Sequence, residues 1–182
     1  NLSLDGLRVS QYYDTHTSSA DPDHVHAGAQ DQGYQLTQGV DQGGEILAFD
    51  QVISGDYGHL TSGDGTHDTV FSVYPGFILV VLDEDDPWRA YVEFPEGERQ
   101  AWLPPIVADP AAPDNLFFCA TRLWYYTATS EGWTPELWSE HDFSEQDGEY
   151  LSAFALSPFD EDRAFAATNY GRFFTSDDRG RS

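Results

Sequence analysis

Two aspartates are the strongest candidates for acid–base chemistry in this sequence. Asp31 lies in the run Gln30–Gly33 and Asp64 lies in Ser62–Gly65, so glycine accompanies each carboxylate in a predicted turn. Hydrolysis of a glycosidic bond uses two such groups, one protonated and one ionised, that face the same cleft. The alternative is that both aspartates cap their turns, which is the commoner role of this residue.

Metal binding is a second, weaker hypothesis. The run His24–His26 places two imidazoles on one face of a predicted strand, because successive side chains of a strand alternate. Asp21 or Asp23 could add a ligand, but a solvated edge strand explains the same pattern. The run Asp83–Asp86 could hold Ca²⁺, although it lacks the ligand spacing of an EF-hand and also suits a solvated hairpin tip. We therefore expect no cofactor, with Ca²⁺ as the one ion left open.

The single cysteine, Cys119, is expected to be buried and unreactive. It follows the apolar run Leu116–Phe118, and no basic side chain adjoins it. With one cysteine, no disulfide can form within the chain.

Aromatic side chains offer a different chemistry, which is stacking on sugars or on a protein partner. The candidates for this binding role are Tyr12, Tyr13, Trp124, Tyr126 and Trp133. Where these residues occur in strands, part of the set would instead pack between sheets.

The net charge of the chain limits the classes of partner that it is expected to bind. It carries 32 Asp and Glu against 8 Arg, with no Lys, for a net charge of −24. This charge repels phosphate backbones and anionic lipids, so we expect neither as a partner. No apolar run is long enough to span a bilayer. The acid excess suits solubility in a salty or outer environment, or alternatively the binding of divalent cations or a basic partner.

The elements that carry these residues are expected to be β-strands. Short runs rich in Val, Tyr, Phe, Leu and Thr alternate with clusters of Gly, Pro, Asp and Asn. No segment shows the long apolar period of a helix, so the pattern predicts an all-β fold.

A repeated unit organises these strands. Three segments, beginning at Asp21, Asp109 and Ser157, each combine a Pro-containing turn, an acidic residue, an apolar strand, a tight turn and an aromatic strand. The corresponding acidic residues Asp114 and Asp162 are 48 positions apart. A four-stranded blade of a β-propeller repeats at about 45 residues.

The repeat therefore predicts a β-propeller, in which sheets stack radially because one blade cannot bury both of its faces. A degenerate copy at residues 69–82 fills the gap between the first two segments. The chain then holds about four blade-like units, the last of them incomplete. Their predicted ranges are 7–50, 51–102, 103–148 and 149–182.

The end of the chain carries the most specific motif. Ser176–Ser182 fits the pattern Ser-x-Asp-x-Gly-x-Ser/Thr and follows an aromatic strand. In this motif and in its repeats the chain resembles the Asp-box (BNR-repeat) β-propeller superfamily, nearest the xyloglucanase-like and sortilin Vps10-like branch. The resemblance implies that Asp178 accepts hydrogen bonds from the turn, that Gly180 supplies the turn, and that Ser176 and Ser182 close a structural hairpin.

The same resemblance implies a function outside the cytoplasm, in an extracellular, cell-surface or periplasmic location. We expect a non-catalytic binding or structural module for a protein partner or a polysaccharide. The alternative is part of a glycoside hydrolase that uses Asp31 and Asp64. Rings of this superfamily usually have six to eight blades, so the four units would belong to a larger ring or to a subunit of a larger assembly.

Overall fold

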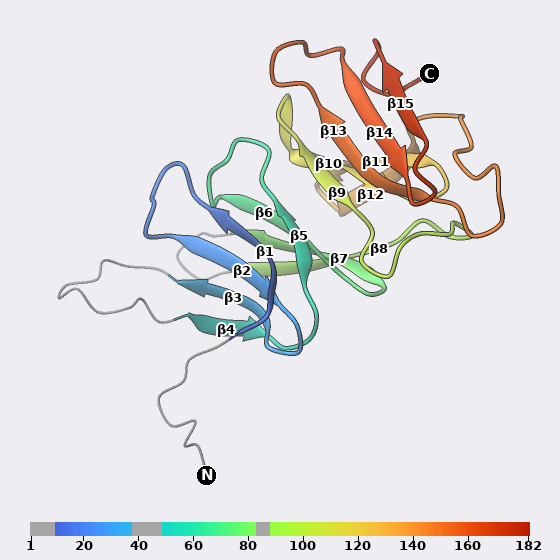
Figure 1. The fold of residues 1–182 in the computed structure, drawn as a ribbon. Helices are drawn as coiled ribbons and strands as arrows, with labels where there is room; N and C mark the ends of the chain where they lie inside the picture. The colour runs from blue at the N-terminus through green and yellow to red at the C-terminus, as the bar shows by residue number, and fades with distance from the viewer. Residues whose placement is uncertain (1–9, 38–48, 83–87) are drawn as a thin grey trace.

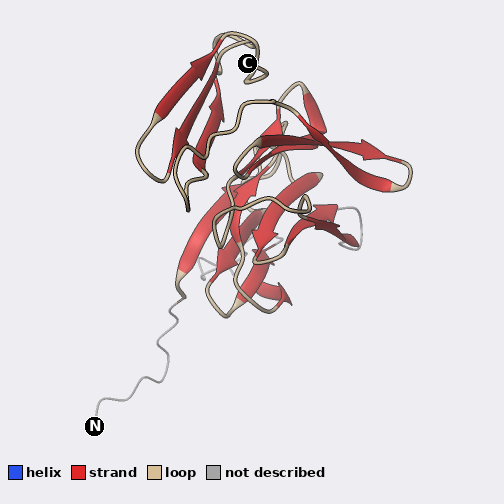
Figure 2. Ribbon diagram, turned by 90° about the vertical axis from the view of Figure 1, so that its right-hand side faces the viewer, coloured by secondary structure: helices blue, strands red, loops and turns tan. Residues whose placement is uncertain are grey.

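The structure, a computed structural model, describes residues 10–37, 49–82 and 88–182. The regular structure in these residues is β-strand throughout, in fifteen strands, and none of it is helix (Figure 2). The expected all-β class is therefore confirmed. The acidic run Asp83–Asp86, predicted as a Ca²⁺ candidate, lies outside the described residues.

The strands form four antiparallel sheets, each built from strands that are consecutive in the sequence (Figure 1). The first sheet contains β1 (Tyr12–Thr17), β2 (Val25–Ala29), β3 (Gly33–Thr37) and β4 (Asp50–Ile53). The second contains β5 (Gly58–Thr61), β6 (Thr69–Tyr74), β7 (Phe77–Leu82) and β8 (Trp88–Glu93). The third contains β9 (Ile106–Asp109), β10 (Ala112–Cys119), β11 (Leu123–Thr129) and β12 (Gly132–Leu137). The fourth contains β13 (Leu151–Leu156), β14 (Ala164–Thr168) and β15 (Phe173–Ser176).

Each sheet is therefore a meander, in which strands that are neighbours along the chain also pair. Antiparallel neighbours need only a short turn between them, which fits the frequent turn residues of the sequence. The first sheet runs to Ile53, whereas the repeats predict a boundary at residue 50. The strands of the other three sheets lie inside the ranges 51–102, 103–148 and 149–182.

The second sheet is buried on both faces, which explains why β7 is apolar without interruption. Ile78 and Val80 belong to the core shared with the third sheet. Leu79 and Val81 point the other way, into the core shared with the first sheet. Because side chains alternate along a strand, a sheet packed between two others needs apolar residues at every position.

The third sheet repeats this arrangement. In β10, Leu116 and Phe118 face the second sheet. Phe117 and Cys119 face the fourth sheet and pack among its buried residues, which include Phe154. The sheets thus pack face to face in chain order, and each interface has its own hydrophobic cluster.

The two ends of the sheets differ in what they carry. The linker end holds the connections between successive sheets and the turn between the second and third strand of each sheet. Here a backbone bridge joins Gln32 of the β2–β3 turn to Gly55 of the β4–β5 connection. The loop end holds the β1–β2, β5–β6, β9–β10 and β13–β14 connections, and there the Ser19 amide donates to the Gly65 carbonyl (2.8 Å).

Candidate functional site

The structure does not bring the predicted pair of carboxylates together. Asp31 lies in the β2–β3 turn, at the linker end, and Asp64 lies in the β5–β6 connection, at the loop end. The length of the strands separates the two ends. A glycosidase needs its two carboxyl groups about 5–10 Å apart across one cleft. Asp31 and Asp64 are not placed for that chemistry.

Asp64 serves its own turn instead. Its carboxylate accepts hydrogen bonds from the Thr66 amide (2.8 Å), the Thr66 hydroxyl (2.8 Å) and the Ser62 hydroxyl (3.0 Å). These bonds, that of the Thr66 amide foremost, lower the pKa of Asp64. A general acid would need a raised pKa, so the geometry favours the turn-capping alternative for this residue.

Asp31 lies beside Asp56, a carboxylate that no sequence pattern marks as a candidate site residue. Its backbone has a φ of 59°, in the left-handed region that Asp tolerates in turns. Its amide donates to Oδ1 of Asp56, in the β4–β5 connection (3.1 Å). The two aspartates thus meet at the linker end, where the first sheet passes into the second.

An exposed aromatic pair lies at the same end of the sheets. The rings of Tyr13, from β1, and Trp102, from the β8–β9 connection, meet edge to face with centroids 6.2 Å apart. The exposed fractions are 39% for Tyr13 and 58% for Trp102, so both rings are open to a ligand. Partial burial, followed by the charges of Asp56 and Asp31, raises the pKa of Tyr13. We call Tyr13, Trp102, Asp31 and Asp56 the linker-end site.

Local structure explains why these rings meet. The β1–β2 register is irregular between Tyr12 and Asp14, and a bulge of this kind re-aims the side chain within it, here Tyr13. On the other side, a hydrogen bond joins His59 Nε2 to the Leu103 carbonyl (3.2 Å), which holds the residue after Trp102 against β5.

Gly58 lets the backbone come close at this point. A Cβ atom on Gly58 would lie 3.3 Å from Leu103 Cδ1 and 3.5 Å from Tyr13 Cβ. The glycine therefore leaves room between β1 and the β8–β9 connection, which together carry both rings.

The other predicted binding aromatics do not join this site. Tyr126 is fully buried, and its hydroxyl donates to the Glu93 carbonyl (2.8 Å). The prediction that it contacts a ligand is therefore wrong, because its ring fills the core between the second and third sheets. Trp124 and Trp133 are partly buried and pack against that same core.

Tyr12 remains exposed but belongs to a different surface. Its exposed fraction is 42%, its hydroxyl donates to Gln35 Oε1 (3.1 Å), and its ring lies 6.1 Å from that of Phe49. Tyr12 contacts Gln35 of β3 and Phe49, whereas Tyr13 contacts Trp102 of the β8–β9 connection, so the two tyrosines belong to different surfaces.

The Asp-box motif forms a compact loop after β15. Asp178 Oδ1 accepts hydrogen bonds from the Arg181 amide (3.0 Å) and the Ser182 amide (3.1 Å), and its Oδ2 accepts one from the Ser182 hydroxyl (2.7 Å). The Ser176 hydroxyl also donates to Asp178, and this is the largest cause of a fall in the pKa of Asp178 to about 2. Gly180 has a φ of 83°, which glycine adopts without strain. Donors within the loop thus occupy Asp178 Oδ1, so this oxygen is not free to accept a hydrogen bond from a ligand.

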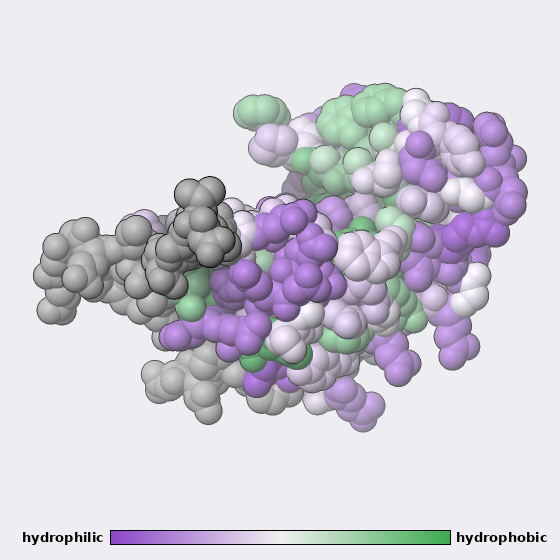
Figure 3. All heavy atoms as spheres, turned by 60° about the horizontal axis from the view of Figure 1, so that its bottom comes forward, coloured by the Kyte–Doolittle hydropathy of each residue, from purple (hydrophilic) through white to green (hydrophobic). Residues whose placement is uncertain are grey.

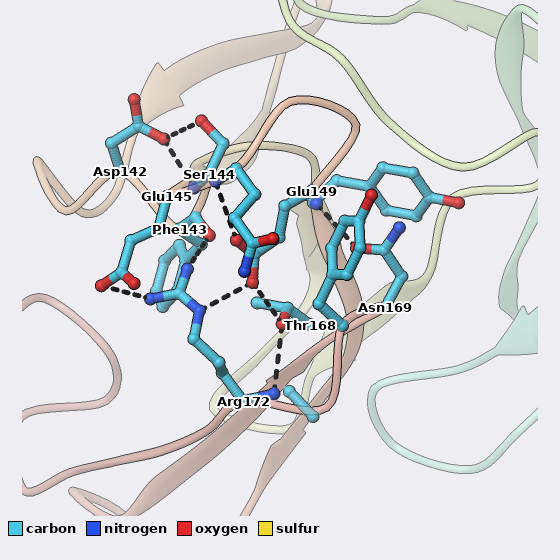
Figure 4. Close-up of polar contacts among 12 residues, drawn as sticks. Asp142, Phe143, Ser144, Glu145, Glu149, Thr168, Asn169 and Arg172 are labelled. Carbon is cyan, nitrogen blue, oxygen red and sulfur yellow. Dashed lines mark hydrogen bonds and ion pairs between the residues drawn. The ribbon is translucent and has the colours of Figure 1, made fainter.

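A buried ion pair fixes the linker end of the fourth sheet (Figure 4). Glu149 is fully buried and accepts hydrogen bonds from Arg172 Nε (2.7 Å) and the Thr168 hydroxyl (2.7 Å). Arg172 also pairs with Glu145 (2.7 Å) and donates to the Phe143 carbonyl. The hydrogen bond from Arg172 is the main cause of a lowered pKa of Glu149. These contacts tie the β12–β13 connection to the β14–β15 turn.

The third sheet has a counterpart of this pair. Glu98 accepts hydrogen bonds from Arg122 Nε (2.8 Å) and from the Thr121 hydroxyl, in the turn between β10 and β11. In both sheets a glutamate from the connection that precedes the sheet thus accepts hydrogen bonds from the turn between its second and third strands. The sequence gives no local signal of either pair, because the partners are far apart along the chain.

The described part of the chain contains neither a grouped set of metal ligands nor a reactive thiol. Within residues 10–37, 49–82 and 88–182, no three His, Cys, Asp or Glu side chains are grouped so that they could hold a metal ion. Cys119 is fully buried, and burial raises the pKa of its thiol. The described part of the chain also has no helix that is long and apolar enough to cross a membrane.

Comparisons with known proteins inform the fold. No protein-family model matches the sequence, and no curated protein matches it. A solved structure of a protein from Lactobacillus plantarum is similar, with a TM-score of 0.54 and 15% sequence identity. The match covers 87% of this chain and 48% of that chain. At this identity the likeness concerns the fold alone, and this chain spans about half the length of the protein that it matches.

Proposed function

We propose that this chain is part of a β-propeller that acts outside the cytoplasm as a non-catalytic binding module for a polysaccharide. The observation that carries the proposal is the linker-end site, in which the exposed rings of Tyr13 and Trp102 lie beside the carboxylates of Asp31 and Asp56. The acid excess and the absence of Lys support a location in an outer, salt-containing environment.

The arrangement of the sheets supports a propeller. Four meanders in chain order pack face to face, and the two inner ones are apolar on both faces. This is the packing that radial stacking of blades requires. The similar protein from Lactobacillus plantarum is about twice as long, so a larger ring would accommodate these four sheets as one part of it.

The chemistry of the site suits a sugar. Aromatic faces stack on the C–H groups of a sugar ring, while carboxylates accept hydrogen bonds from its hydroxyl groups. The surface that faces the viewer in Figure 3 is mostly hydrophilic, with hydrophobic surface gathered towards the C-terminal sheet. Isolated rings on a polar surface favour a hydrated ligand over a broad apolar protein interface. The net charge of −24 disfavours anionic polymers, so the ligand is expected to be neutral or to carry amino groups.

Binding rather than hydrolysis is favoured by the placement of the acids. The predicted pair, Asp31 and Asp64, lies at opposite ends of the sheets. Asp56, which does lie near Asp31, accepts a hydrogen bond from the Asp31 amide and lies next to the Tyr13 hydroxyl. The Asp56 carboxylate therefore orients both the turn and the aromatic ring, as a binding surface requires.

The test compares the chain with its Trp102→Ala and Tyr13→Ala variants. Binding to neutral, amino and anionic oligosaccharides is measured by titration calorimetry, and retention on insoluble polysaccharides is measured in parallel. Loss of a central ring is expected to weaken binding about tenfold or more, which corresponds to about 1.4 kcal/mol. The matched control is Phe159→Ala, because Phe159 is 97% exposed but lies in the β13–β14 connection, at the loop end.

Equal affinities of the Trp102→Ala variant and the parent chain would refute the linker-end site. If no saccharide binds to the parent chain, the proposal of a polysaccharide ligand fails and a protein partner becomes the better explanation. Product release from any oligosaccharide would overturn the non-catalytic assignment.

A further inference from the structure

A groove opens between β8 and β12, the last strands of the second and third sheets (Figure 1). One wall is β8 with the residues that follow it, and the other is the β11–β12 turn with the start of β12. The space between the walls is about 800 Å³. We call it the outer groove, and it is lined by residues 90–96 and 129–133 together with Leu82 and Pro135.

The floor of the outer groove is hydrophobic core that the two sheets leave open. Four of the lining residues are only partly buried and pack against the cluster between the second and third sheets: Leu82, Ala90, Phe94 and Trp133. The core shared by these sheets is therefore not closed at their last strands. Apolar surface of this kind gains free energy when a partner covers it.

The indole of Trp133 is held in place without a ligand. Its Nε1 donates to the Asp114 carbonyl (2.7 Å), and its ring meets that of Phe71 edge to face, with centroids 6.3 Å apart. Trp133 is also one of the aromatic residues that the sequence predicts for binding. A side chain whose orientation is already fixed loses little conformational entropy when a partner binds, which favours Trp133 as a contact residue.

Three glutamates make the outer groove negative. Glu93 and Glu96 belong to the β8 wall, Glu131 belongs to the opposite wall, and no Arg or His is among the lining residues. All three glutamates are exposed, and no described residue forms an ion pair or a hydrogen bond with their carboxylates. The carboxylates of Asp64 and Asp178, in contrast, accept hydrogen bonds within their own turns. The glutamates of the groove are therefore available to a cationic partner.

The shape of the outer groove suits an extended segment. Faces of packed sheets lie about 10 Å apart, whereas an α-helix with its side chains is about 10–12 Å wide. Pro135 has no N–H group, so a strand that paired with β12 would lack a hydrogen bond at this position. A partner is therefore held mainly through its side chains, as extended and polyproline II peptides are in grooves lined by aromatic residues.

We propose that the outer groove binds an extended basic peptide segment of a partner protein, in which an apolar residue covers Trp133 and neighbouring Arg or Lys side chains pair with Glu96 and Glu131. Charge complementarity supports this occupant, because the lining carries three glutamates and no cationic side chain. The net charge of −24 also attracts basic segments and repels acidic ones. The outer groove shares no residue with the linker-end site, so this proposal is independent of the saccharide ligand.

The test measures binding of the 182-residue chain to labelled synthetic peptides by fluorescence anisotropy, at an ionic strength of about 0.15 M. The first peptide alternates Arg with Pro and Leu. In the second peptide Gly and Ser replace Pro and Leu, and in the third peptide Glu replaces Arg. The first peptide is expected to bind at least about tenfold more tightly than either of the others, because it alone supplies both charge and apolar surface.

A pair of double variants separates the outer groove from the overall charge. Glu96→Gln with Glu131→Gln removes one carboxylate from each wall and is expected to weaken binding of the first peptide about tenfold or more. The matched control is Glu140→Gln with Glu161→Gln, since both residues are exposed and lie outside the groove. It removes the same number of charges and is expected to change the affinity less than about threefold.

A second measurement follows the indole directly. The NMR signal of the Trp133 Nε1–H group is expected to shift when the first peptide is added, and Trp133→Phe identifies this signal by its loss. Trp133→Phe is also expected to weaken binding. Trp102→Ala, which removes a ring of the linker-end site, is expected to bind the peptide as the parent does. Should Trp133→Phe not fold, the exposed glutamate variants still test the groove.

Four results would overturn the proposal. One is that the parent chain does not bind the first peptide. Another is equal affinity of the two double variants, since binding would then reflect overall charge alone. The third is equal affinity for the first and second peptides, which would leave the apolar floor without a role. The fourth is displacement of the peptide by an oligomer of glucosamine or by the Trp102→Ala substitution, which would assign binding to a saccharide or to the linker-end site.

Discussion

Replacement of Arg179 by Met tests whether the C-terminal hairpin is anchored by a buried ion pair. Arg179 Nη2 donates to Asp109 Oδ1 (2.6 Å), and the pair joins the Asp-box loop to the end of β9 in the third sheet. The side chain of Asp109 is only 4% exposed, and that of Arg179 is 21% exposed. Arg179→Met keeps the stem of the side chain but removes the charge that faces the buried carboxylate.

The expected cost follows from what remains around Asp109. Loss of one partner from a fully buried pair costs about 3–5 kcal/mol. Asp109 would keep the hydrogen bonds from the Tyr125 hydroxyl (2.7 Å) and the Ala111 amide (2.8 Å). Since two donors remain and Arg179 is partly solvated, we expect the free energy of unfolding to fall by about 3 kcal/mol, at the lower end of that range.

The matched control is Arg163→Met. Arg163 also pairs with an aspartate, Asp177 (2.9 Å), but the two side chains are 40% and 78% exposed. An exposed pair contributes at most about 1 kcal/mol, so this variant should be nearly as stable as the parent. Both substitutions remove one positive charge, so any change in overall repulsion is the same for both.

The assay is equilibrium unfolding in urea, followed by far-ultraviolet circular dichroism and analysed by linear extrapolation. An Asp109→Asn variant and the corresponding double variant complete a cycle that isolates the coupling between the two side chains. The reasoning fails if Arg179→Met and Arg163→Met have the same stability. It also fails if the cycle returns a coupling energy near zero.

Two further substitutions test the close packing of the sheets and the Asp-box loop. Gly28→Ala should destabilise the fold by about 3 kcal/mol in the same urea assay, because its Cβ would lie 2.1 Å from the Tyr57 carbonyl oxygen. Gly171→Ala, with no neighbour within 4 Å, should cost only the strain of its φ of 86°, about 1–2 kcal/mol. Asp178→Asn should lower the thermal unfolding midpoint at neutral pH. The folded pKa of Asp178, about 2, lies below the ordinary value of 3.8, so its contribution is present above pH 3.8 and is lost as the pH falls through about 2. Thermal scans across this interval should therefore converge for variant and parent, and a constant gap between them would contradict the assignment.

The candidate site was only partly predictable. Tyr13 and Asp31 stand out in the sequence because an aromatic residue and a glycine-flanked acid are common features of binding surfaces. Their partners, Trp102 and Asp56, lie in connections between sheets with no distinguishing pattern around them. The assignment of Tyr126 to a ligand failed for a related reason, since an aromatic strand residue has the same local sequence whether its ring faces solvent or a second sheet.

The sequence by itself determined the elements of this protein. Apolar residues that alternate with polar ones specify strands, and uninterrupted apolar runs such as Phe77–Leu82 specify strands of the inner sheets. Turn residues between the strands specify meanders. All of these features depend on neighbours within a few positions of the chain. The tertiary structure alone decided which side chains meet. The Tyr13–Trp102 pair, the stacked rings of His24 and His67, and the Arg179–Asp109 pair each join residues from different sheets or their connections. Their contacts depend on how whole sheets stack, and no local pattern along the chain encodes that geometry.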